Sequence, residues 1–286
     1  MNTGIRIIAV LLCFVSFGVV CAYGAPPTPS TPTVFTSIDF PGARTTAAEG
    51  INRSQTIVGF YSDSANAIHG FTLSNGNYQS LDAPAGMSTA AYGVNDAGTI
   101  VGTYINFSQH GFSDLNGTFR TMDFGSILTS TNGVNRSGSM VGFYSNSGSD
   151  LQGFLSQGQH FSTLNFPGAT RTGPNGISGT GVVVGEYHDS ANHIHGFVLQ
   201  GGTYSTVDYP GALLTIATGI NSSRVIVGIY LDAKGVRHGF ELQGSVFTTL
   251  DFPGASETDV NGIDDLGRIV GDYVDSGGVQ HGFWAE

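Results

Sequence analysis

Five histidines recur at one position of a repeating sequence. The tripeptide His-Gly-Phe begins at His69, His110, His195, His238 and His281, and a sixth copy reads Gln-Gly-Phe from Gln152. Imidazole nitrogens bind metal ions, so a ring of metal ligands is one interpretation. Zinc, however, holds histidine nitrogens about 2.0–2.1 Å away, and equivalent residues of separate repeats seldom converge on one point. We therefore predict a structural role for these histidines and no metal site.

An acidic residue also recurs, directly before a turn that usually contains Pro-Gly. It is Asp39, Asp82, Asp123, Asp208 and Asp251, with Asn165 in the remaining copy. An aspartate whose role survives replacement by asparagine acts as a hydrogen-bond acceptor, which a catalytic carboxylate would not tolerate. Calcium is an alternative for the loops that begin at Asp63, Asp189, Asp232 and Asp275. Each loop offers one carboxylate, whereas calcium takes six to eight oxygen ligands, so we interpret the loops as turns and expect no cofactor.

Charged residues break the repeat mainly in its fourth copy. Function on a repeat scaffold is carried by residues that depart from the repeat, and ordinary surface variation is the alternative. The candidate ligand-binding residues are Arg44, Arg171, Glu186, His188, Asp189 and His193. The chain contains no serine nucleophile elbow, no zinc-protease motif and no phosphate-binding loop, so we assign no catalytic residue.

These residues lie on a repeat of 41 to 43 residues. Each copy reads as four short strands, T-x-A-x-G-I-N, x-I-V-G-x-Y, H-G-F-x-L and a segment such as 204–208, separated by turns rich in glycine, asparagine and proline. The first recognisable piece of the repeat is a lone fourth strand, Val34 to Phe40, and the last, 259–286, holds the first three strands of a repeat. The sequence therefore predicts an all-β, six-bladed β-propeller with four-stranded blades, whose last blade is closed by the N-terminal strand.

The phrase G-I-N-x-x-G-x-I-V-G-x-Y followed by H-G-F resembles the probable extracellular repeats of the HAF family, named after a His-Ala-Phe triplet. The resemblance covers residues 34–286, and this chain carries glycine where the family name has alanine. The resemblance implies an exported bacterial repeat protein. It implies no general activity, and therefore no catalytic residue.

The first thirty-odd residues have a different character. Arg6 precedes an apolar run, Ile7 to Val20, and a small-residue site follows it, which is the layout of a secretory signal peptide. We predict a signal peptide over 1–24, a Pro/Thr-rich spacer over 25–33 and the repeat domain over 34–286. Lipidation at Cys21 is the alternative. Both cysteines, Cys13 and Cys21, fall within the leader, so the mature chain uses no disulfide.

Composition restricts the class of function. The net charge is −11 and only 11% of residues are charged, which disfavours nucleic acid and anionic lipid as partners; the apolar run is too short to make an integral membrane protein. We predict a secreted or surface-associated, non-catalytic binding or scaffold module, with a glycan or a cell-surface protein as partner. The alternatives are a propeller-scaffold enzyme, a hydrolase or lyase acting on extracellular glycans, and a purely structural envelope protein.

Overall fold

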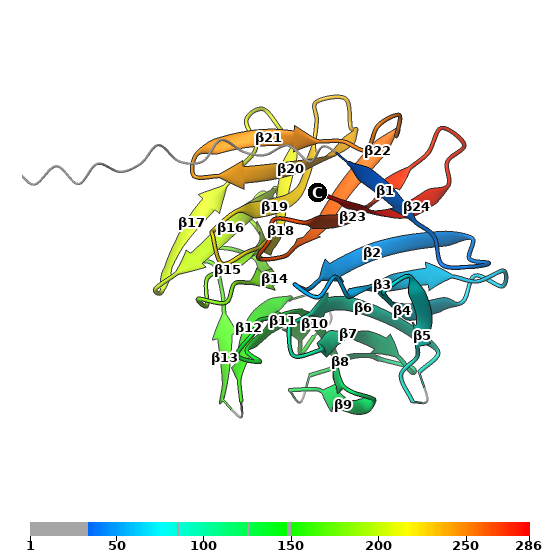
Figure 1. Ribbon diagram of the computed structural model, residues 1–286. Helices are drawn as coiled ribbons and strands as arrows, with labels where there is room; N and C mark the ends of the chain where they lie inside the picture. Colours follow the sequence, from blue (N-terminus) through cyan, green and yellow to red (C-terminus); the bar gives the residue numbers. More distant parts are fainter. Residues whose placement is uncertain (1–33, 85, 125, 148–149, 159) are drawn as a thin grey trace, which may run out of the picture.

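The computed structural model describes residues 34–286 apart from 85, 125, 148–149 and 159 (Figure 1). The expected signal peptide (1–24) and spacer (25–33) lie outside the described residues. Every regular element of the described chain is a β-strand, and no helix there is long and apolar enough to cross a membrane. The prediction of an all-β protein is confirmed.

In the described part of the chain, the strands form four sheets of four strands and one sheet of eight. The four-stranded sheets consist of β2 (Thr45–Ile51), β3 (Ile57–Ser62), β4 (Ile68–Ser74) and β5 (Asn77–Leu81); β14 (Arg171–Ile177), β15 (Val183–His188), β16 (Ile194–Gln200) and β17 (Thr203–Val207); β18 (Leu214–Ile220), β19 (Ile226–Leu231), β20 (Arg237–Gln243) and β21 (Val246–Leu250); and β22 (Glu257–Ile263), β23 (Ile269–Val274), β24 (Gln280–Ala285) and β1 (Phe35–Ile38). The eight-stranded sheet consists of β6 (Ser88–Val94), β7 (Thr99–Ile105), β8 (Gln109–Leu115), β9 (Thr118–Met122), β10 (Leu128–Val134), β11 (Met140–Ser145), β12 (Gln152–Gln157) and β13 (His160–Leu164).

The sheets are arranged radially around one axis (Figure 1). The strands β2, β6, β10, β14, β18 and β22 contact one another in that order, and β22 also contacts β2, so the circle is closed. Within the eight-stranded sheet, β6–β9 and β10–β13 are joined where Leu128 of β10 pairs in parallel with Gln109 of β8. This radial arrangement defines a β-propeller and confirms that part of the prediction.

The two ends of the described chain meet in one sheet. β1 pairs antiparallel with β24, from Phe35 opposite Ala285 to Ile38 opposite Gly282. Ile38 is buried against the neighbouring sheet β2–β5, and the ring of Phe35 packs edge-on against Phe252. The N-terminal strand therefore completes the sheet formed by the last three strands, as the split repeat predicts.

Turn residues set the strand lengths. In the hairpin between β4 and β5, Asn75 and Gly76 have φ values of 50° and 75°, the left-handed conformations that a two-residue hairpin turn requires and that Asn-Gly favours. The glycine of the Pro-Gly turn is also left-handed, with a φ of 81° at Gly42. Turns of this kind reverse the chain, and the strands of the described residues are four to seven residues long.

Each four-stranded sheet, and each half of the eight-stranded sheet, is packed around the phenylalanine of its third strand. The six side chains are fully buried: Phe71, Phe112, Phe154, Phe197, Phe240 and Phe283. The glycine of the second strand makes room for the ring. A Cβ on Gly228 would lie 2.0 Å from the carbonyl oxygen of Ile216 and 2.8 Å from Cε1 of Phe240, so no larger residue fits beneath the phenylalanine.

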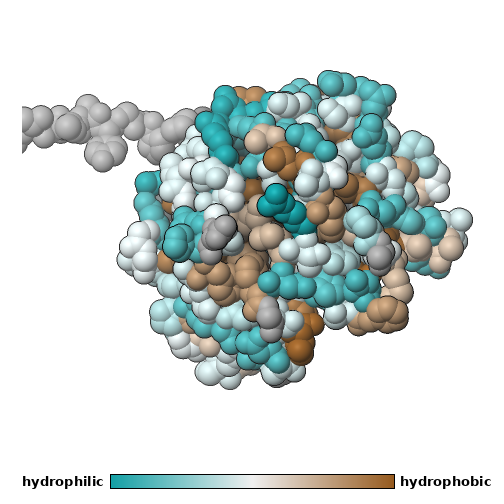
Figure 2. All heavy atoms as spheres, turned by 90° about the horizontal axis from the view of Figure 1, so that it is seen from below, coloured by the Kyte–Doolittle hydropathy of each residue, from teal (hydrophilic) through white to brown (hydrophobic). Residues whose placement is uncertain are grey.

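On the face shown in Figure 2, hydrophilic and apolar residues are interspersed. The exposed apolar side chains include Met87, Ile127 and Leu213, which occupy equivalent positions one residue before β6, β10 and β18. The backbone N–H of each donates to the last carbonyl of the adjacent second strand or of its continuation, for example Leu213 to Leu231 at 2.8 Å. The links into the first strands and the loops after the second strands therefore share one face of the propeller.

Candidate functional site

A cavity of about 530 Å³ follows the propeller axis. It is lined mainly by the first strands β2, β6, β10, β14, β18 and β22, as expected if the fourth strand of each repeat is outermost. The glycine of the Gly-Ile/Val-Asn motif allows these strands to converge. A Cβ on Gly50 would lie 2.8 Å from the carbonyl oxygen of Tyr92, and a Cβ on Gly262 would lie 2.6 Å from that of Glu49. Glycine at this position therefore keeps the channel narrow and the ring closed.

The residue before each of these glycines faces the cavity. The six are Glu49, Tyr92, Asn132, Asn175, Thr218 and Asn261. Several of them bond to the next first strand around the axis: Asn132 Nδ2 donates to the carbonyl of Pro174 (3.1 Å) and Thr218 Oγ1 to that of Val260 (2.8 Å). The last of these bonds joins the final repeat to the first, from Asn261 Nδ2 of β22 to the carbonyl of Ala48 in β2 (3.1 Å). The channel wall is thus a belt of hydroxyl, amide and carboxyl groups.

Carboxyl groups in and beside the channel have raised pKa values. Burial, and then the nearby charge of Asp272, raises the pKa of Glu49 to about 8. Burial raises the pKa of Glu186 to about 7, although Asn175 donates a hydrogen bond to it. Burial also raises the pKa of Asp272, which accepts bonds from Asn261 Nδ2 at 2.8 Å and Gln280 Nε2 at 2.7 Å. Desolvation disfavours a charged carboxylate, so Glu49 and Glu186 exchange protons near neutral pH.

A second cavity of about 330 Å³ lies beside Asp272. Its wall includes Arg237 from β20, whose Nε donates to Asp259 Oδ1 at 2.9 Å. Asp259 is 6% exposed, and the paired guanidinium compensates the charge that burial would otherwise disfavour. Arg237 and Asp259 come from neighbouring sheets, so this ion pair also joins the two sheets.

A collar of β-branched side chains narrows the channel. Ile51, Val94, Val134, Ile177, Ile220 and Ile263 line both the large cavity and a smaller one of about 80 Å³. Beyond the collar, the asparagines of the repeat are bonded around the axis; Asn52 Nδ2 donates to the carbonyl of Asn95 (3.0 Å) and Asn95 Nδ2 to that of Asn135 (2.9 Å). The collar thus separates the polar channel from the end of the propeller formed by the turns between first and second strands.

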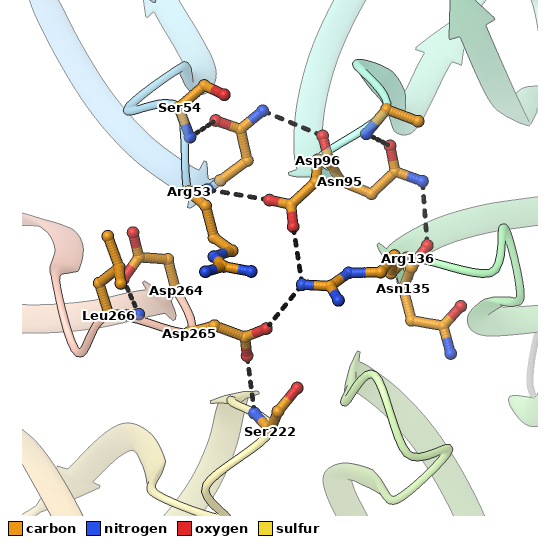
Figure 3. A network of polar contacts seen from close by, with 12 residues as sticks. Arg53, Ser54, Asn95, Asp96, Asn135, Arg136, Ser222, Asp264, Asp265 and Leu266 are labelled. Atoms are coloured by element: carbon orange, nitrogen blue, oxygen red, sulfur yellow. Dashed lines mark hydrogen bonds and ion pairs between the residues drawn. The ribbon is translucent and has the colours of Figure 1, made fainter.

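Ion pairs close this end of the channel (Figure 3). The guanidinium of Arg136 lies 3.2 Å from Asp96 and 3.6 Å from Asp265, which come from different sheets. The same two carboxylates accept backbone N–H groups, Asp96 from Arg53 at 3.0 Å and Asp265 from Ser222 at 2.8 Å. The collar and these ion pairs therefore narrow this end of the channel, which favours entry of a ligand from the opposite face, where the links into the first strands lie.

The structure brings together only part of the predicted ligand-binding set. Arg171 and His188 are directly opposite each other in β14 and β15, and Asp189 bonds to His193. Glu186 lies in the channel wall. Arg44 directly precedes β2. The sheet β2–β5 does not border the sheet β14–β17, so Arg44 lies apart from the other candidates on that face of the propeller. The set is divided between the channel, the loop 189–193 and a separate link.

The repeated histidines make the same contacts in five sheets. Nδ1 of His69, His110, His195, His238 and His281 donates to Asp82, Asp123, Asp208, Asp251 and Asp39, at 2.6 to 3.1 Å. The imidazole also stacks on the tyrosine of the second strand, with ring centroids 5.2 Å apart for His69 and Tyr61. The repeated histidine and aspartate thus join the third strand to the end of the fourth.

The loops considered for calcium are turns held by one carboxylate oxygen. Asp63 Oδ1 accepts the backbone N–H groups of Ala65 (2.8 Å) and Ala67 (2.9 Å). Asp232 and Asp275 make the corresponding pairs of bonds. One oxygen of each carboxylate is therefore engaged by its own loop, as turn-forming aspartates commonly are.

Of the residues that line the channel, sequence reasoning identified Glu186 and missed the others. Asparagine is common in turns, so the type of Asn132, Asn175 and Asn261 gives no signal by itself. Their position, one residue before an almost invariant glycine, is occupied by Glu, Tyr, Asn, Asn, Thr and Asn in the successive repeats. Variation at one position inside a well-kept motif was the signal that could have identified them.

The fold and its axial cavity define a β-propeller with a polar central channel. Putative TolB from Agrobacterium tumefaciens has a similar structure, with a TM-score of 0.59 at 11% identity over 85% of this chain and 90% of that chain. AofleA from Arthrobotrys oligospora gives a TM-score of 0.53 at 11% identity, over 88% and 82%. A mutant Aleuria aurantia lectin in complex with α-methyl-L-fucoside gives 0.47 at 13%, over 72% and 76%. Such identities show the fold alone; no family model and no curated protein matches the chain.

Proposed function

We propose that this chain is an exported, non-catalytic six-bladed β-propeller that binds a glycan at the open end of its central channel. Six blades are supported by the closed circle of six first strands and by the single residue pair that joins the halves of the eight-stranded sheet. Export rests on the leader at 1–24, and the repeat phrases support membership of the HAF family.

The observation that carries the binding proposal is that the residue type varies between repeats at the channel positions and not at the scaffold positions. The scaffold positions, namely the buried phenylalanines and the glycines beneath them, are the same in every sheet. The six channel positions instead carry four residue types, Glu, Tyr, Asn and Thr. A scaffold needs no such variety at its axis, whereas a binding site placed on a repeat scaffold needs different groups at different points.

The chemistry of the channel fits a polyhydroxylated ligand. Amide, hydroxyl and carboxyl groups both donate and accept hydrogen bonds, and Tyr92 and Phe143 add aromatic surface to the wall. The acids Glu49 and Glu186, with pKa values of about 8 and about 7, carry little charge in mildly acidic solution and then donate hydrogen bonds. A volume of about 530 Å³ falls within the range of about 300–1,000 Å³ of small-molecule sites.

The test is a binding screen on residues 25–286 against neutral and acidic oligosaccharides, by thermal shift and then calorimetric titration. A ligand of the native state raises the melting temperature. Asn132→Ala removes the Oδ1 acceptor from the channel wall and should weaken binding about two- to tenfold, because one hydrogen bond contributes roughly 0.5–1.5 kcal/mol. Asn77→Ala, an exposed change at the start of β5, is the matched control. A screen in which no saccharide binds would eliminate the glycan and favour a cell-surface protein or a structural role.

The enzymatic alternative is favoured by one observation. Burial, and then the charge of Asp272 from β23, raises the pKa of Glu49 in β2, and a carboxyl group that keeps its proton near neutral pH can serve as a general acid in glycoside hydrolysis. If the chain is such a hydrolase, it releases reducing sugar from bound oligosaccharide, and Glu49→Gln abolishes turnover while binding remains. Absence of turnover on every saccharide that binds would leave the non-catalytic function.

A further inference from the structure

One loop of the sheet β14–β17 places three metal-binding side chains together. Asp189 begins the loop after β15, and His193 and His195 lie at its end, at alternate positions where β16 starts. Side chains two residues apart along a strand project to the same side. From this geometry we propose that the loop is a zinc site, with Asp189 Oδ2, His193 Nδ1 and His195 Nε2 as ligands and water completing the coordination.

The distances suit coordination after small side-chain movements. The three ligand atoms lie within 4.8 Å of one another. His193 Nδ1 is 3.1 Å from Asp189 Oδ2, and His195 Nε2 is 3.6 Å from the same oxygen. The side chain of His193 is 68% exposed, so it can rotate to bring its nitrogen to the roughly 2.0–2.1 Å that zinc requires. The other oxygen of Asp189 accepts the backbone N–H groups of Ala191 and His193, both at 2.8 Å, which fixes the carboxylate.

The second carboxylate of this sheet orients His195 as a ligand. Nδ1 of His195 donates to Asp208 Oδ2 at 3.0 Å, so the lone pair of the neutral imidazole is on Nε2. That lone pair faces Asp189 Oδ2 at 3.6 Å, so the two atoms can bind the same ion. A carboxylate that holds the far nitrogen of a metal-bound histidine is the usual outer partner of zinc sites.

The first repeat supplies an almost identical loop without the third ligand. Residues 63–69 read D-S-A-N-A-I-H and residues 189–195 read D-S-A-N-H-I-H, so they differ only at Ala67 and His193. His69 makes the same contacts as His195, with Nδ1 2.9 Å from Asp82 and Nε2 3.6 Å from Asp63. The expectation of no metal concerned histidines of different repeats, whereas this cluster lies within one sheet. The loop 63–69 therefore has a histidine–aspartate pair, and the presence of His193 in the loop 189–195 adds the third ligand.

The donor set selects the class of ion. Two imidazoles and one carboxylate with a free position is a ligand set of zinc, and imidazole suits transition metals. Calcium and magnesium prefer oxygen ligands throughout, and this loop offers one free carboxylate oxygen. We therefore expect the site to take zinc and to ignore both hard cations.

The experiment is calorimetric titration of tag-free residues 25–286, freed of metal by chelator, with zinc chloride, and with calcium and magnesium chloride in parallel. Wild type should bind one zinc ion and neither of the other two. His193→Ala should weaken zinc binding by more than about tenfold, since even loss of an outer partner costs about 10–100-fold. His160→Ala, which removes an exposed histidine of β13, should leave binding unchanged. The designed gain is Ala67→His, which should raise the stoichiometry from one ion to two.

Circular dichroism of each variant separates loss of a ligand from loss of fold. The proposal is overturned if wild type binds no zinc, if His193→Ala binds it as tightly as wild type, or if calcium binds equally well. The glycan proposal does not depend on this result, because His193 and His195 do not line the channel cavity.

Discussion

Carboxyl groups in this chain occupy two environments with opposite effects on their pKa. The loop residue Asp63 accepts the backbone N–H groups of Ala67 and Ala65, chiefly that of Ala67, and its pKa is lowered despite some desolvation. Glu49 lies in the channel wall, where burial and the charge of Asp272 raise its pKa to about 8. A change of pH near neutrality therefore alters the charge inside the channel while the loop carboxylates stay ionised.

At the residue scale, Glu49→Gln should change how stability depends on pH. The folded pKa of Glu49 (about 8) exceeds its ordinary value of 4.5, so between these values the folded state binds more protons than the unfolded state. Stability conferred by this group is then present below about pH 4.5 and is lost as pH rises to about 8. Glutamine cannot ionise, so the variant should be more stable than wild type at about pH 9, by the order of 1 kcal/mol or about 2–4 °C.

Thermal unfolding of both proteins from about pH 4 to about pH 9 measures this difference. Glu257→Gln, the same change at the start of β22, controls for the loss of one negative charge. Parallel curves for wild type and Glu49→Gln would show that the carboxyl group of Glu49 stays hydrated in the folded protein.

At the scale of elements, the strands were predictable from the sequence and the channel was not. The four-strand unit, its turns and the buried phenylalanine follow from spacing and residue type, because each is a local property repeated every 41 to 43 residues. The bonds that build the channel wall join residues of different sheets, as from Asn132 to Pro174 or from Asn261 to Ala48. Such contacts depend on the angle between sheets, which no local pattern encodes, and so Arg44 was grouped with residues of a distant sheet.

The close packing of the second strand against the third allows a prediction about the stability of a sheet. Gly228→Ala places a Cβ 2.0 Å from the carbonyl oxygen of Ile216 and 2.8 Å from the ring of Phe240. Neither the backbone nor the buried ring can move easily. We therefore expect the free energy of unfolding to fall by about 3 kcal/mol or more, at the upper end of the costs of overpacking. Gly235→Ala, in the turn between β19 and β20, meets no atom within 4 Å but has a φ of 82°, and should lower the stability by only about 1–2 kcal/mol.

Urea denaturation midpoints of the two variants, compared with wild type, measure both costs. Equal destabilisation would mean that the strands separate enough to admit a methyl group, and the close contact of Gly228 with Phe240 would then have little part in fixing the sheet.

At the scale of the whole molecule, the N-terminal strand β1 completes the sheet formed by the C-terminal strands β22–β24. β1 provides the outer strand for β24, and His281 of β24 bonds to Asp39, which follows β1, at 2.8 Å. Without β1, the edge of β24 would expose unpaired backbone groups of the kind that promote aggregation. The sequence predicted this pairing because the fragments at the two ends add up to one repeat.

Removal of β1 should therefore destabilise the entire propeller rather than one strand. A chain of residues 42–286 lacks the buried side chain of Ile38 and the packed ring of Phe35, each of which contributes about 1.5–3 kcal/mol when buried. We expect a loss of about 3–6 kcal/mol, which lowers the melting temperature by at least about 6 °C relative to residues 34–286. A synthetic peptide of residues 34–41, added in excess, should restore part of the loss because it binds only the folded state. Residues 42–286 could instead melt at the same temperature as residues 34–286, with no effect of the peptide. Contacts between the sheets alone would then hold the circle closed, and the pairing of β1 with β24 would not be needed for stability.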